Sequence, residues 1–581
     1  RGLGDVYKRQ VMPDHVVRPN LLSDSDRLQL GDSLPEDQLD LAETSDVQLA
    51  GENYLAYLAF LAPSTRLVLS FPEQGTDGEE LAISPYVKQI KQLFSLKAQH
   101  VGQEPEADIT LTEFQRHFSG AKRPVVTQLL NLARKNGRQL PAAFVSLAAW
   151  LKRDVQVGDL ANRVFASLNY RNQPEKLQPD LVEKLYGKTI NTSISKLEEF
   201  YANQYAYFLK YGLKLKERDV FALSPANTGE FFHAVLDQLH RRLMAEQRDL
   251  TQISATELTA YLNEIIPQQL ARPQFQILHS SARMDYLSRQ LAATIQQVSW
   301  TIHQQLQHSQ ARPYKTEVLF GQVGSREGLR PLEFALPQNH QVKVRGKIDR
   351  IDLLENSDQT YLGIVDYKSS LHKFNYRDAY YGMSLQMLTY LSALIKNFDL
   401  LVPGRQAKPA GAVYLHLQNP KLELKVVNQN SFEKAWLQKN KYDGLLLADP
   451  QLLELLDGDL TADQSGVSLV YPFRRKKAGD YSSTGRTDPQ LITPEQLDLL
   501  LWQNEQLIKK AAATIFAGDL AIDPALWPDQ RSALQYSPFK AIMQFDAMLP
   551  ENNYHRLPLM SAKEVLAAIQ IERSQNNGTK A

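Results

Sequence analysis

Three short runs of the sequence contain residue types that can bind a divalent cation beside a phosphate. They are Gly346 to Asp352 (GKIDRID), Ile364 to Lys368 (IVDYK) and Gln386 to Tyr390 (QMLTY). Carboxylates and water molecules are the ligands that Mg²⁺ prefers. Such a cation can lower the pKa of a bound water and stabilise charge on a phosphate during displacement. The three runs therefore predict a metal site suited to phosphodiester hydrolysis.

A strand with one polar face is predicted around Asp349. Apolar and polar residues alternate from Val342 to Asp349, and successive side chains of a strand point to opposite faces of a sheet. Asp349 falls on the polar face. The polar run from Glu355 to Thr360 then predicts a tight turn.

The return strand is predicted from Tyr361 to Lys368. It is apolar on both faces until its last residues, which is typical of a central strand. Asp366 and Lys368 are two positions apart, so their side chains share one face. The amine could orient a water molecule or stabilise developing charge. An Asp-x-Lys tripeptide alone is more typical of a surface ion pair.

The third run favours a functional site over a surface ion pair. A helix is predicted from Ala379 to Lys396, with Gln386 and Tyr390 one turn apart on the same face. An acidic strand, a turn, a buried strand ending in Asp-x-Lys and a helix with this Gln/Tyr pair form an ordered set. That order is far more specific than any of its parts.

Composition limits the class of protein and the kinds of site. The chain has 581 residues, enough for three or four domains or subdomains. Its 65 basic and 65 acidic residues cancel, so DNA contacts must come from local patches. The sequence has no cysteine, which excludes disulfides and thiolate metal sites within this chain. No apolar run is long enough to span a membrane, and a cytoplasmic location is expected.

The pattern along the chain suggests a division into several parts. Residues 1–10 fit poorly with the rest of the chain and are expected to be a non-native scar. With the absent initiator Met, they suggest a C-terminal fragment of a longer protein. A buried strand is predicted from Arg66 to Phe71, and helices predominate from residue 84 to 185.

The motifs together resemble a known nuclease family. GKIDRID, IVDYKSS and YYGMSLQMLTYL resemble the RecB-type branch of the PD-(D/E)XK nucleases. SISKLEEFYANQYAYFLKYGLKLKER and TGEFFHAVLDQL are similar to the segments that open the nuclease domain of AddB/RexB subunits of bacterial helicase–nucleases. The resemblance implies an α/β chain. A helicase-like α/β fragment in residues 11–185 would precede a helix-rich, restriction-endonuclease-like domain with a small mixed sheet in residues 190–575.

The resemblance also implies roles for individual residues. The Mg²⁺ ligands would be His233, Asp349, Asp366 and the backbone carbonyl of Tyr367. Lys368 would activate or steer the water molecule, and Gln386 and Tyr390 would orient the site or contact DNA. A lone histidine on a helix is otherwise more often a core residue than a ligand.

Two departures from the family pattern carry expectations of their own. Many members hold the nuclease domain with a four-cysteine iron–sulfur cluster, and the matching positions here are Asn203, Leu534, Ser537 and Met543. No iron–sulfur cluster is therefore expected, which favours the RexB branch. Hydrophobic packing of residues such as Tyr536, Phe539 and Phe545 would hold the ends of the domain.

The second departure concerns ATP. The segment ENYLAYLAFLAPSTRLVLSFP is similar to the last motif of UvrD-like helicases, but Ala62 stands where an arginine would reach the γ-phosphate. Loss of such an arginine lowers hydrolysis by about 10³-fold or more. No helicase activity is expected from this chain, although an ATP-binding motif could precede it.

The implied function is that of a nuclease subunit. It would degrade single-stranded DNA in the 5′→3′ direction, together with a RexA/AddA-type helicase–nuclease partner, at double-stranded DNA ends prepared for homologous recombination. Two alternatives stay open: a stand-alone Mg²⁺-dependent DNA nuclease, and a non-catalytic DNA-end-binding scaffold. The intact Asp349, Asp366 and Lys368 argue against the scaffold.

Overall fold

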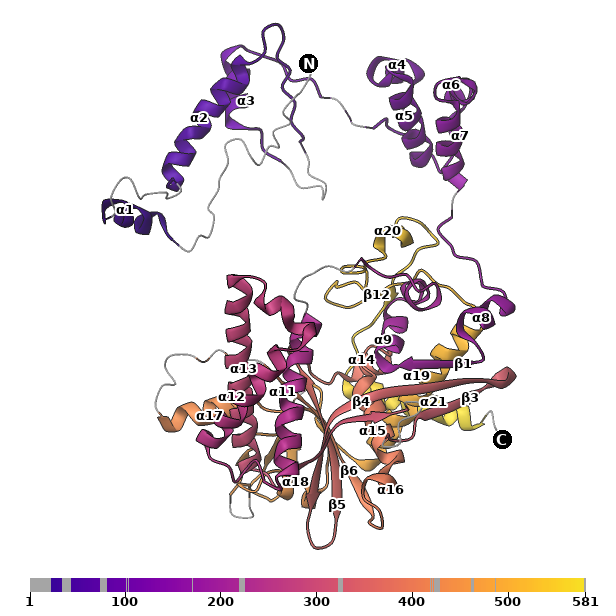
Figure 1. Ribbon diagram of the computed structural model, residues 1–581. Coiled ribbons are helices and arrows are strands. Elements are labelled where there is room, and N and C mark those ends of the chain that lie inside the picture. Colours follow the sequence, from indigo (N-terminus) through magenta and orange to yellow (C-terminus); the bar gives the residue numbers. More distant parts are fainter. Residues whose placement is uncertain are drawn as a thin grey trace. The chain divides into compact units, whose positions relative to one another are not determined.

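The computed structural model describes most of the chain as two compact units, Arg1–Tyr170 and Arg171–Ala581 (Figure 1). The described residues are 22–33, 43–73, 81–100, 102, 104–169, 171–218, 225–321, 328–417, 419–420, 422, 429–460, 464–485 and 487–578. The scar predicted at residues 1–10 lies outside them. The division falls upstream of the boundary predicted at residues 185–190, and the helicase-like origin of the first unit stays a prediction.

The described part of the first unit is helical. Its helices are α1 (Asp24–Ser33), α2 (Ser45–Leu61), α3 (Pro85–Leu93), α4 (Leu111–Phe118), α5 (Lys122–Lys135), α6 (Ala142–Arg153) and α7 (Gly158–Ala166). α4 begins at a capping box, in which the Thr110 hydroxyl accepts the Glu113 amide and the Glu113 carboxylate accepts the Thr110 amide. Helices α4 to α7 share a core of their own that includes Leu129 and Leu132.

The buried strand predicted from Arg66 to Phe71 is wrong. The segment has no regular secondary structure, and Leu67 and Val68 are 43% and 71% exposed. A strand needs a neighbour to satisfy its backbone hydrogen bonds. The described part of the first unit contains no other strand that could pair with this segment.

The second unit is built around a mixed sheet, which has eight strands within the described residues. They are β1 (Thr189–Ser193), β2 (Arg312–Phe320), β3 (Leu332–Leu336), β4 (His340–Glu355), β5 (Thr360–Lys368), β6 (Ala407–His416), β7 (Asp443–Leu447) and β11 (Leu491–Ile492). The order is β1-β4-β5-β6-β7-β11, and β2 and β3 also pair with β4. β5 runs antiparallel to β4 and parallel to β6. The mixed α/β architecture predicted from the sequence is confirmed.

The long strand β4 changes partners along its length. Its first half pairs with β1 and β3, and its second half pairs with β2 and β5. The predicted alternation holds up to Ile348, but every residue from Ile348 to Asp352 is buried. Asp349 therefore does not face open solvent, because helices cover both faces of the sheet at this point.

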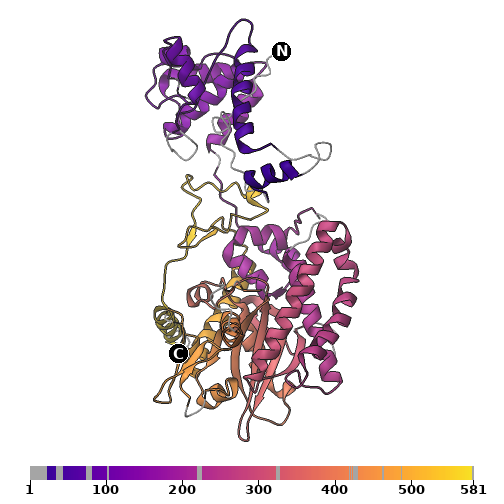
Figure 2. The ribbon, with the colours of Figure 1, turned by 90° about the vertical axis from the view of Figure 1, so that its left-hand side faces the viewer.

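Helices cover the two faces of the sheet. α11 (Pro225–Ala245), α12 (Ala255–Leu270) and α13 (Ala282–Gln307) lie together over one face, and α15 (Gln386–Lys396) and α19 (Pro494–Phe516) lie over the other (Figures 1 and 2). α12 and α19 each begin at a capping box, formed by Ser254 with Glu257 and by Thr493 with Gln496.

The helix predicted from Ala379 to Lys396 is two helices, α14 (Tyr376–Tyr380) and α15. Gly382 lies between them with φ of +81°, a conformation that favours glycine, and a Cβ there would overlap the ring of Tyr201. The remaining elements are α8 (Pro179–Tyr186), α9 (Ile194–Ala202), α10 (Gln204–Tyr207), α16 (Phe398–Leu401), α17 (Gln429–Lys439), α18 (Pro450–Leu456), α20 (Lys540–Met543), α21 (Ala562–Gly578), β8 (Gly466–Val467), β9 (Phe473–Arg475), β10 (Tyr481–Ser483), β12 (Ala525–Leu526) and β13 (His555–Arg556).

The end of the second unit packs on its beginning. A small apolar cluster joins Phe208 and Leu209 to Leu534, Phe539 and Met543. Phe545 packs against this cluster as expected, but Tyr536 is 89% exposed, so its predicted packing role is wrong. Leu534 and Phe539 turn inward on either side of it.

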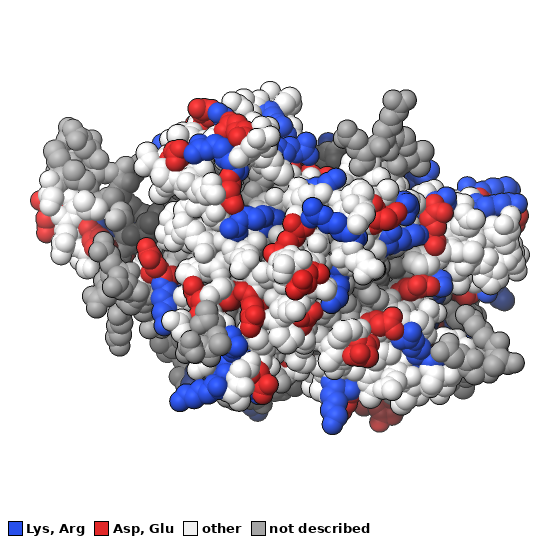
Figure 3. All heavy atoms as spheres, turned by 90° about the horizontal axis from the view of Figure 1, so that it is seen from below, with Lys and Arg blue, Asp and Glu red and all other residues white. Residues whose placement is uncertain are grey.

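Charge is distributed without a dominant sign. Basic and acidic side chains are interspersed over the face of the molecule seen from below (Figure 3), in keeping with their equal numbers. Among the described helices, none combines the length and the apolar character that a membrane span requires.

Candidate active site

Three carboxylates lie level with one another on three neighbouring strands: Glu317 on β2, Asp349 on β4 and Asp366 on β5. Their level is set by the flanking pairs Thr316↔Arg350, Val318↔Ile348 and Arg350↔Val365. Glu317 and Asp349 meet His233 of α11, whereas Asp366 meets Gln386 of α15. The pairing of β4 with β5 ends just before Asp349 and Asp366, so the two strands part where these acids meet.

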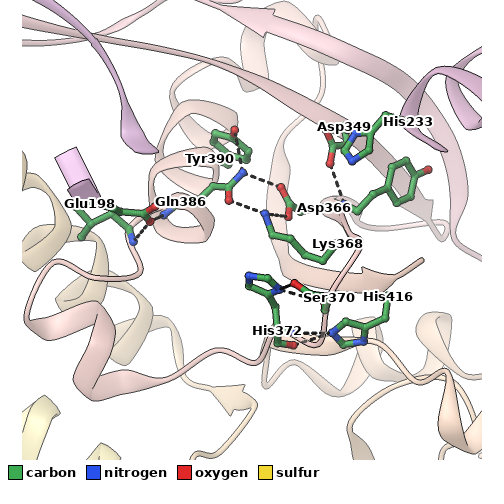
Figure 4. Close-up of polar contacts among 12 residues, drawn as sticks. Glu198, His233, Asp349, Asp366, Lys368, Ser370, His372, Gln386, Tyr390 and His416 are labelled. Atoms are coloured by element: carbon green, nitrogen blue, oxygen red, sulfur yellow. Dashed lines mark hydrogen bonds and ion pairs between the residues drawn. The ribbon is translucent and has the colours of Figure 1, made fainter. Parts of the chain in front are cut away.

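Asp349 occupies the middle of this carboxylate row. It is 6% exposed, and its Oδ2 accepts the backbone N–H of Tyr367 at 2.8 Å. Its Oδ1 lies 3.1 Å from Nδ1 of His233, which α11 brings over the sheet. The sequence-predicted pair of His233 and Asp349 is thus in direct contact (Figure 4).

His233 is held by two acids. Its Nδ1 also lies 3.8 Å from Glu317 Oε1. Burial lowers the pKa of His233, but the contacts with Asp349 and Glu317 outweigh burial and raise it to about 10. Without a cation at the site, this histidine carries the positive charge that balances the acids.

Glu317 was not foreseen from the sequence. Burial alone would raise its pKa, but His233 and Lys347 lower the pKa of Glu317 below its usual value. Its φ is +51°, a conformation that residues other than glycine rarely adopt and that is often found at functional sites. No motif marks Glu317, but counting the register of β2 against β4 places it level with Asp349.

Asp366, Lys368 and Gln386 form a closed ring of contacts. Nζ of Lys368 lies 2.7 Å from Asp366 Oδ2 and donates to Gln386 Oε1 at 2.7 Å. Gln386 Nε2 completes the ring by donating to Asp366 Oδ1 at 3.0 Å. Burial raises the pKa of Asp366 to about 6, while Lys368 opposes the shift and Asp349 adds to it.

Gln386 of this ring lies in the first turn of α15. Gln386 Nε2 also lies 3.1 Å from the hydroxyl of Tyr390, so the predicted pair meets on one helical face. Glu198 of α9, a second residue not foreseen, accepts the amides of Leu385 and Gln386 at 2.7 and 3.1 Å. A carboxylate at a helix N-terminus is favourable, and this contact fixes the start of α15 and so the position of Gln386.

Tyr367 contributes its backbone rather than its ring to this side of the strand, because its amide donates to Asp349. Its ring lies on the face of α11, 5.4 Å from the ring of His233, and its hydroxyl is 3.5 Å from Nε2 of His240. The predicted use of its carbonyl as a metal ligand stays a prediction.

An open cavity of about 1000 Å³ leads to Glu317 and Asp349 of the row, and His233 and Tyr390 also line it. Its other charged lining residues are the basic Arg241, Arg242, Arg272 and Lys347 and the acidic Glu230 and Asp237. The basic side chains among them could contact the phosphates of a DNA strand, because binding to a nucleic-acid backbone is largely charge neutralisation.

The donors fit a divalent cation. Ligand atoms of His233, Glu317 and Asp349 all lie within 4.8 Å of one another. The buried oxygens Glu317 Oε1 and Asp366 Oδ2 lie 3.8 Å from His233 Nδ1 and 2.7 Å from Lys368 Nζ, so each acid is balanced by a positive side chain. Carboxylates suit Mg²⁺ or Mn²⁺, and an imidazole beside them is a ligand more typical of a transition metal.

Comparison with known proteins agrees with this geometry. The PD-(D/E)XK nuclease superfamily matches residues 191–527, a range that holds the whole carboxylate row. Similar curated proteins are each named as one subunit of an ATP-dependent helicase/deoxyribonuclease. That of Lactiplantibacillus plantarum is 48% identical over 98% of this chain and 48% of its own length. That of Latilactobacillus sakei is 44% identical over 98% and 48%, and that of Enterococcus faecalis is 39% identical over 96% and 46%.

The chain spans about half the length of the curated relatives it matches. The superfamily match, by contrast, covers more than half of the chain itself. It also covers the sheet and helices that bring His233 against Asp349 and Lys368 against Asp366. This chain belongs to the PD-(D/E)XK nuclease superfamily.

Proposed function

We propose that this chain is the nuclease subunit of an ATP-dependent helicase–nuclease and that it hydrolyses single-stranded DNA. The convergence of Asp349 and Asp366 where β4 and β5 part, with Lys368 beside them, carries the proposal. The name shared by the relatives supports the wider role. In that role the chain would pair with a motor subunit of the AddA/RexA type in the cytoplasm. It would trim the 5′-ended strand at double-strand breaks before recombination.

Asp349 and Asp366 would hold Mg²⁺, with His233 and Glu317 completing the shell and the carbonyl of Tyr367 available beside them. A bound Mg²⁺ supplies positive charge at the scissile phosphate and lowers the pKa of a water molecule. For the histidine to serve as a ligand, Nδ1 of His233 must give up the proton that it shares with Asp349 in the absence of a cation.

Lys368 would act on the phosphate and the attacking water. Its ammonium group is fixed by Asp366 and Gln386, so it meets a substrate without first losing conformational freedom. From this position it would stabilise the negative charge that builds on the phosphate oxygens. Gln386 and Tyr390 would keep Asp366 and Lys368 at the right spacing.

The substitution Asp366→Asn tests the proposal. With Mg²⁺ and end-labelled single-stranded DNA, we expect cleavage to fall by at least about 100-fold, the scale seen when a charge-stabilising group is lost. Mn²⁺ binding, measured by electron paramagnetic resonance, should weaken in parallel. Labels at the 5′ and 3′ ends report the polarity of degradation.

Asp358→Asn is the matched control, because Asp358 is exposed in the turn between the same two strands. It should leave both cleavage and Mn²⁺ binding unchanged. Wild-type cleavage by Asp366→Asn would overturn the assignment of this site. Degradation of duplex ends by the chain alone, without ATP or a motor subunit, would instead favour a stand-alone nuclease.

A further inference from the structure

A second cavity lies in the nuclease unit, away from the carboxylate row. It has a volume of about 540 Å³, and no residue that lines it also lines the active-site cavity. Helix α19 forms one wall, and α21, Tyr381 and single residues of α9, α14, β3 and β13 form the others. Figure 1 shows these helices gathered on one side of the sheet. The proposed hydrolysis of DNA uses none of the side chains in this cavity.

Aromatic rings dominate the walls. Tyr201, Tyr380, Tyr381 and Trp502 all line the cavity and are partly exposed there. Their positions are fixed: the Tyr201 hydroxyl donates to Leu507 O at 2.7 Å, and the rings of Tyr380 and Tyr381 meet edge to face at 5.1 Å. Fixed aromatic rings are the platforms on which bases of single-stranded nucleic acids stack.

One residue that lines the cavity has a buried polar atom without a hydrogen-bond partner among the described residues. Gln503 is 7% exposed, and its Oε1 accepts no hydrogen bond from any of the residues that the structure describes. A buried amide oxygen of this kind normally has a donor. Rotation of this side chain would bring the oxygen to the cavity, where the base-pairing edge of a nucleobase offers at least one N–H donor.

Basic side chains stand at the same cavity. Lys510 is exposed, and Lys509 lies over the ring of Phe334 and pairs with Glu505. An ammonium group at the mouth can neutralise a phosphate. The one acid among the lining residues, Glu572, already accepts the hydroxyl of Tyr380 at 2.5 Å.

We propose that this cavity binds one nucleotide of a single-stranded DNA, with its base stacked on the tyrosines and its phosphate at Lys510. Tyr381 lies just after α14, and a short segment joins it to Gln386 of the active site. In this proposal the same DNA strand also reaches the carboxylate row. The inference rests on the proposed function for its class of ligand.

Binding without cleavage tests the subsite. The chain carries Asp366→Asn and is kept in EDTA, and fluorescence anisotropy measures its Kd for a labelled 12-residue oligothymidylate. Adding Lys510→Glu or Tyr381→Leu should raise the Kd by about tenfold each, the scale of one lost stacking or phosphate contact. Lys510→Glu should also reduce the slope of log Kd against log salt by about one.

Lys563→Glu is the matched control, because Lys563 is an exposed residue of α21 outside the lining of the cavity. It should leave the Kd unchanged. If Lys510→Glu and Tyr381→Leu bind like their parent, the subsite is wrong. Nuclease activity of the wild type is measured separately, so the subsite can fail while the proposed function stands.

A free nucleotide carries the same base and phosphate as a DNA strand and is the alternative ligand for this cavity. A lone dTMP makes too few contacts to repay the entropy of binding, and no saturable binding is expected in a calorimetric titration. Saturable binding of dTMP that Lys510→Glu abolishes would overturn the assignment to a DNA strand.

Discussion

Gln386 sets the spacing between the acid and the amine of the active site. Its side-chain amide contacts both residues with different atoms: Nε2 donates to Asp366, and Oε1 accepts from Lys368. Glu198 fixes the backbone from which it extends. We therefore treat Gln386 as a positioning residue whose loss leaves the metal ligands in place.

Replacing Gln386 by leucine should lower the single-turnover rate of cleavage by about 10- to 100-fold, as is usual for partners that orient ligands. Mn²⁺ affinity should change less, because Asp349 and His233 are untouched. Gln341→Leu is the control, since Gln341 is an exposed residue of β4. A Gln386→Leu variant that cleaves at the wild-type rate would contradict this role.

A buried histidine makes stability depend on pH. His240 is 2% exposed, and burial lowers its pKa to about 3. In the unfolded chain it regains its ordinary pKa of about 6.5 and binds a proton that the folded state refuses. Stability from this residue is therefore complete above pH 6.5 and is lost as the pH falls from 6.5 towards 3.

The variant His240→Gln should remove this dependence. Each pH unit below 6.5 costs the wild type about 1.4 kcal/mol through His240, and the variant should show a slope that is smaller by this amount. Denaturant unfolding at several pH values between 7 and 4.5 measures it. Equal slopes for both proteins would show that His240 does not titrate on unfolding.

At the scale of elements, close contact between two strands depends on glycine. Gly411 of β6 has φ of +131°, and a Cβ there would overlap the carbonyl oxygen of Leu445 on β7. Gly444 of β7 has φ of +146° and faces Ala412 O in the same way. The two glycines let β6 and β7 pair at a distance that side chains would prevent.

The variant Gly411→Ala should lose roughly 2–4 kcal/mol of unfolding free energy through strain and overlap. Gly404→Ala separates the two causes, because Gly404 also has positive φ, +77°, but open space around it. It should lose only about 1 kcal/mol. Chemical denaturation of the two variants gives the comparison, and equal losses would mean that backbone strain alone matters.

Much of the local structure around the site could be predicted from the sequence. The β4 and β5 strands, the turn between them and the Gln386/Tyr390 face follow from periodicity, which local side chains determine. The burial of Asp349 and the role of Glu317 could not be predicted in this way. Both depend on which elements cover the sheet and on the register of β2.

The errors have the same origin. Arg66 to Phe71 has the composition of a strand without a partner strand among the described residues. Tyr536 is apolar enough to pack but lies on the outer side of a turn. Gly382 separates α14 from α15 with φ of +81°, at a place where a Cβ would overlap the ring of Tyr201. In each case the structure depends on residues that are distant in the sequence, and a local sequence pattern carries no information about them.

For the whole second unit, a buried amide pair joins the two ends. Asn552 is 2% exposed; its Nδ2 donates to Asn172 O at 2.7 Å, and its Oδ1 accepts Asn172 Nδ2 at 2.9 Å. These residues are 380 positions apart. Beside them, Asn203 Nδ2 donates to the sulfur of Met543 at 3.3 Å, at two of the positions matched to cluster cysteines.

The variant Asn552→Ala should lower the unfolding free energy by about 1–3 kcal/mol, because it leaves buried polar groups of Asn172 without this partner. Asn553→Ala is the neighbouring control, since Asn553 is exposed and should change stability by less than about 0.5 kcal/mol. Thermal and denaturant unfolding both report the difference. Equal stability of the two variants would show that the amide pair does not stabilise the contact between the two ends.

The exchange of partners along β4 limits how the gene for such a nuclease can change in length. One codon inserted between the part of β4 that pairs with β1 and β3 and the part that carries Asp349 would turn every later side chain to the opposite face. Asp349 would then lose its position beside both Glu317 on β2 and Asp366 on β5. Codons gained at residues 356–359, between β4 and β5, would leave the two strands in register. Insertions and deletions that preserve activity should therefore accumulate in that turn and be absent from the strand.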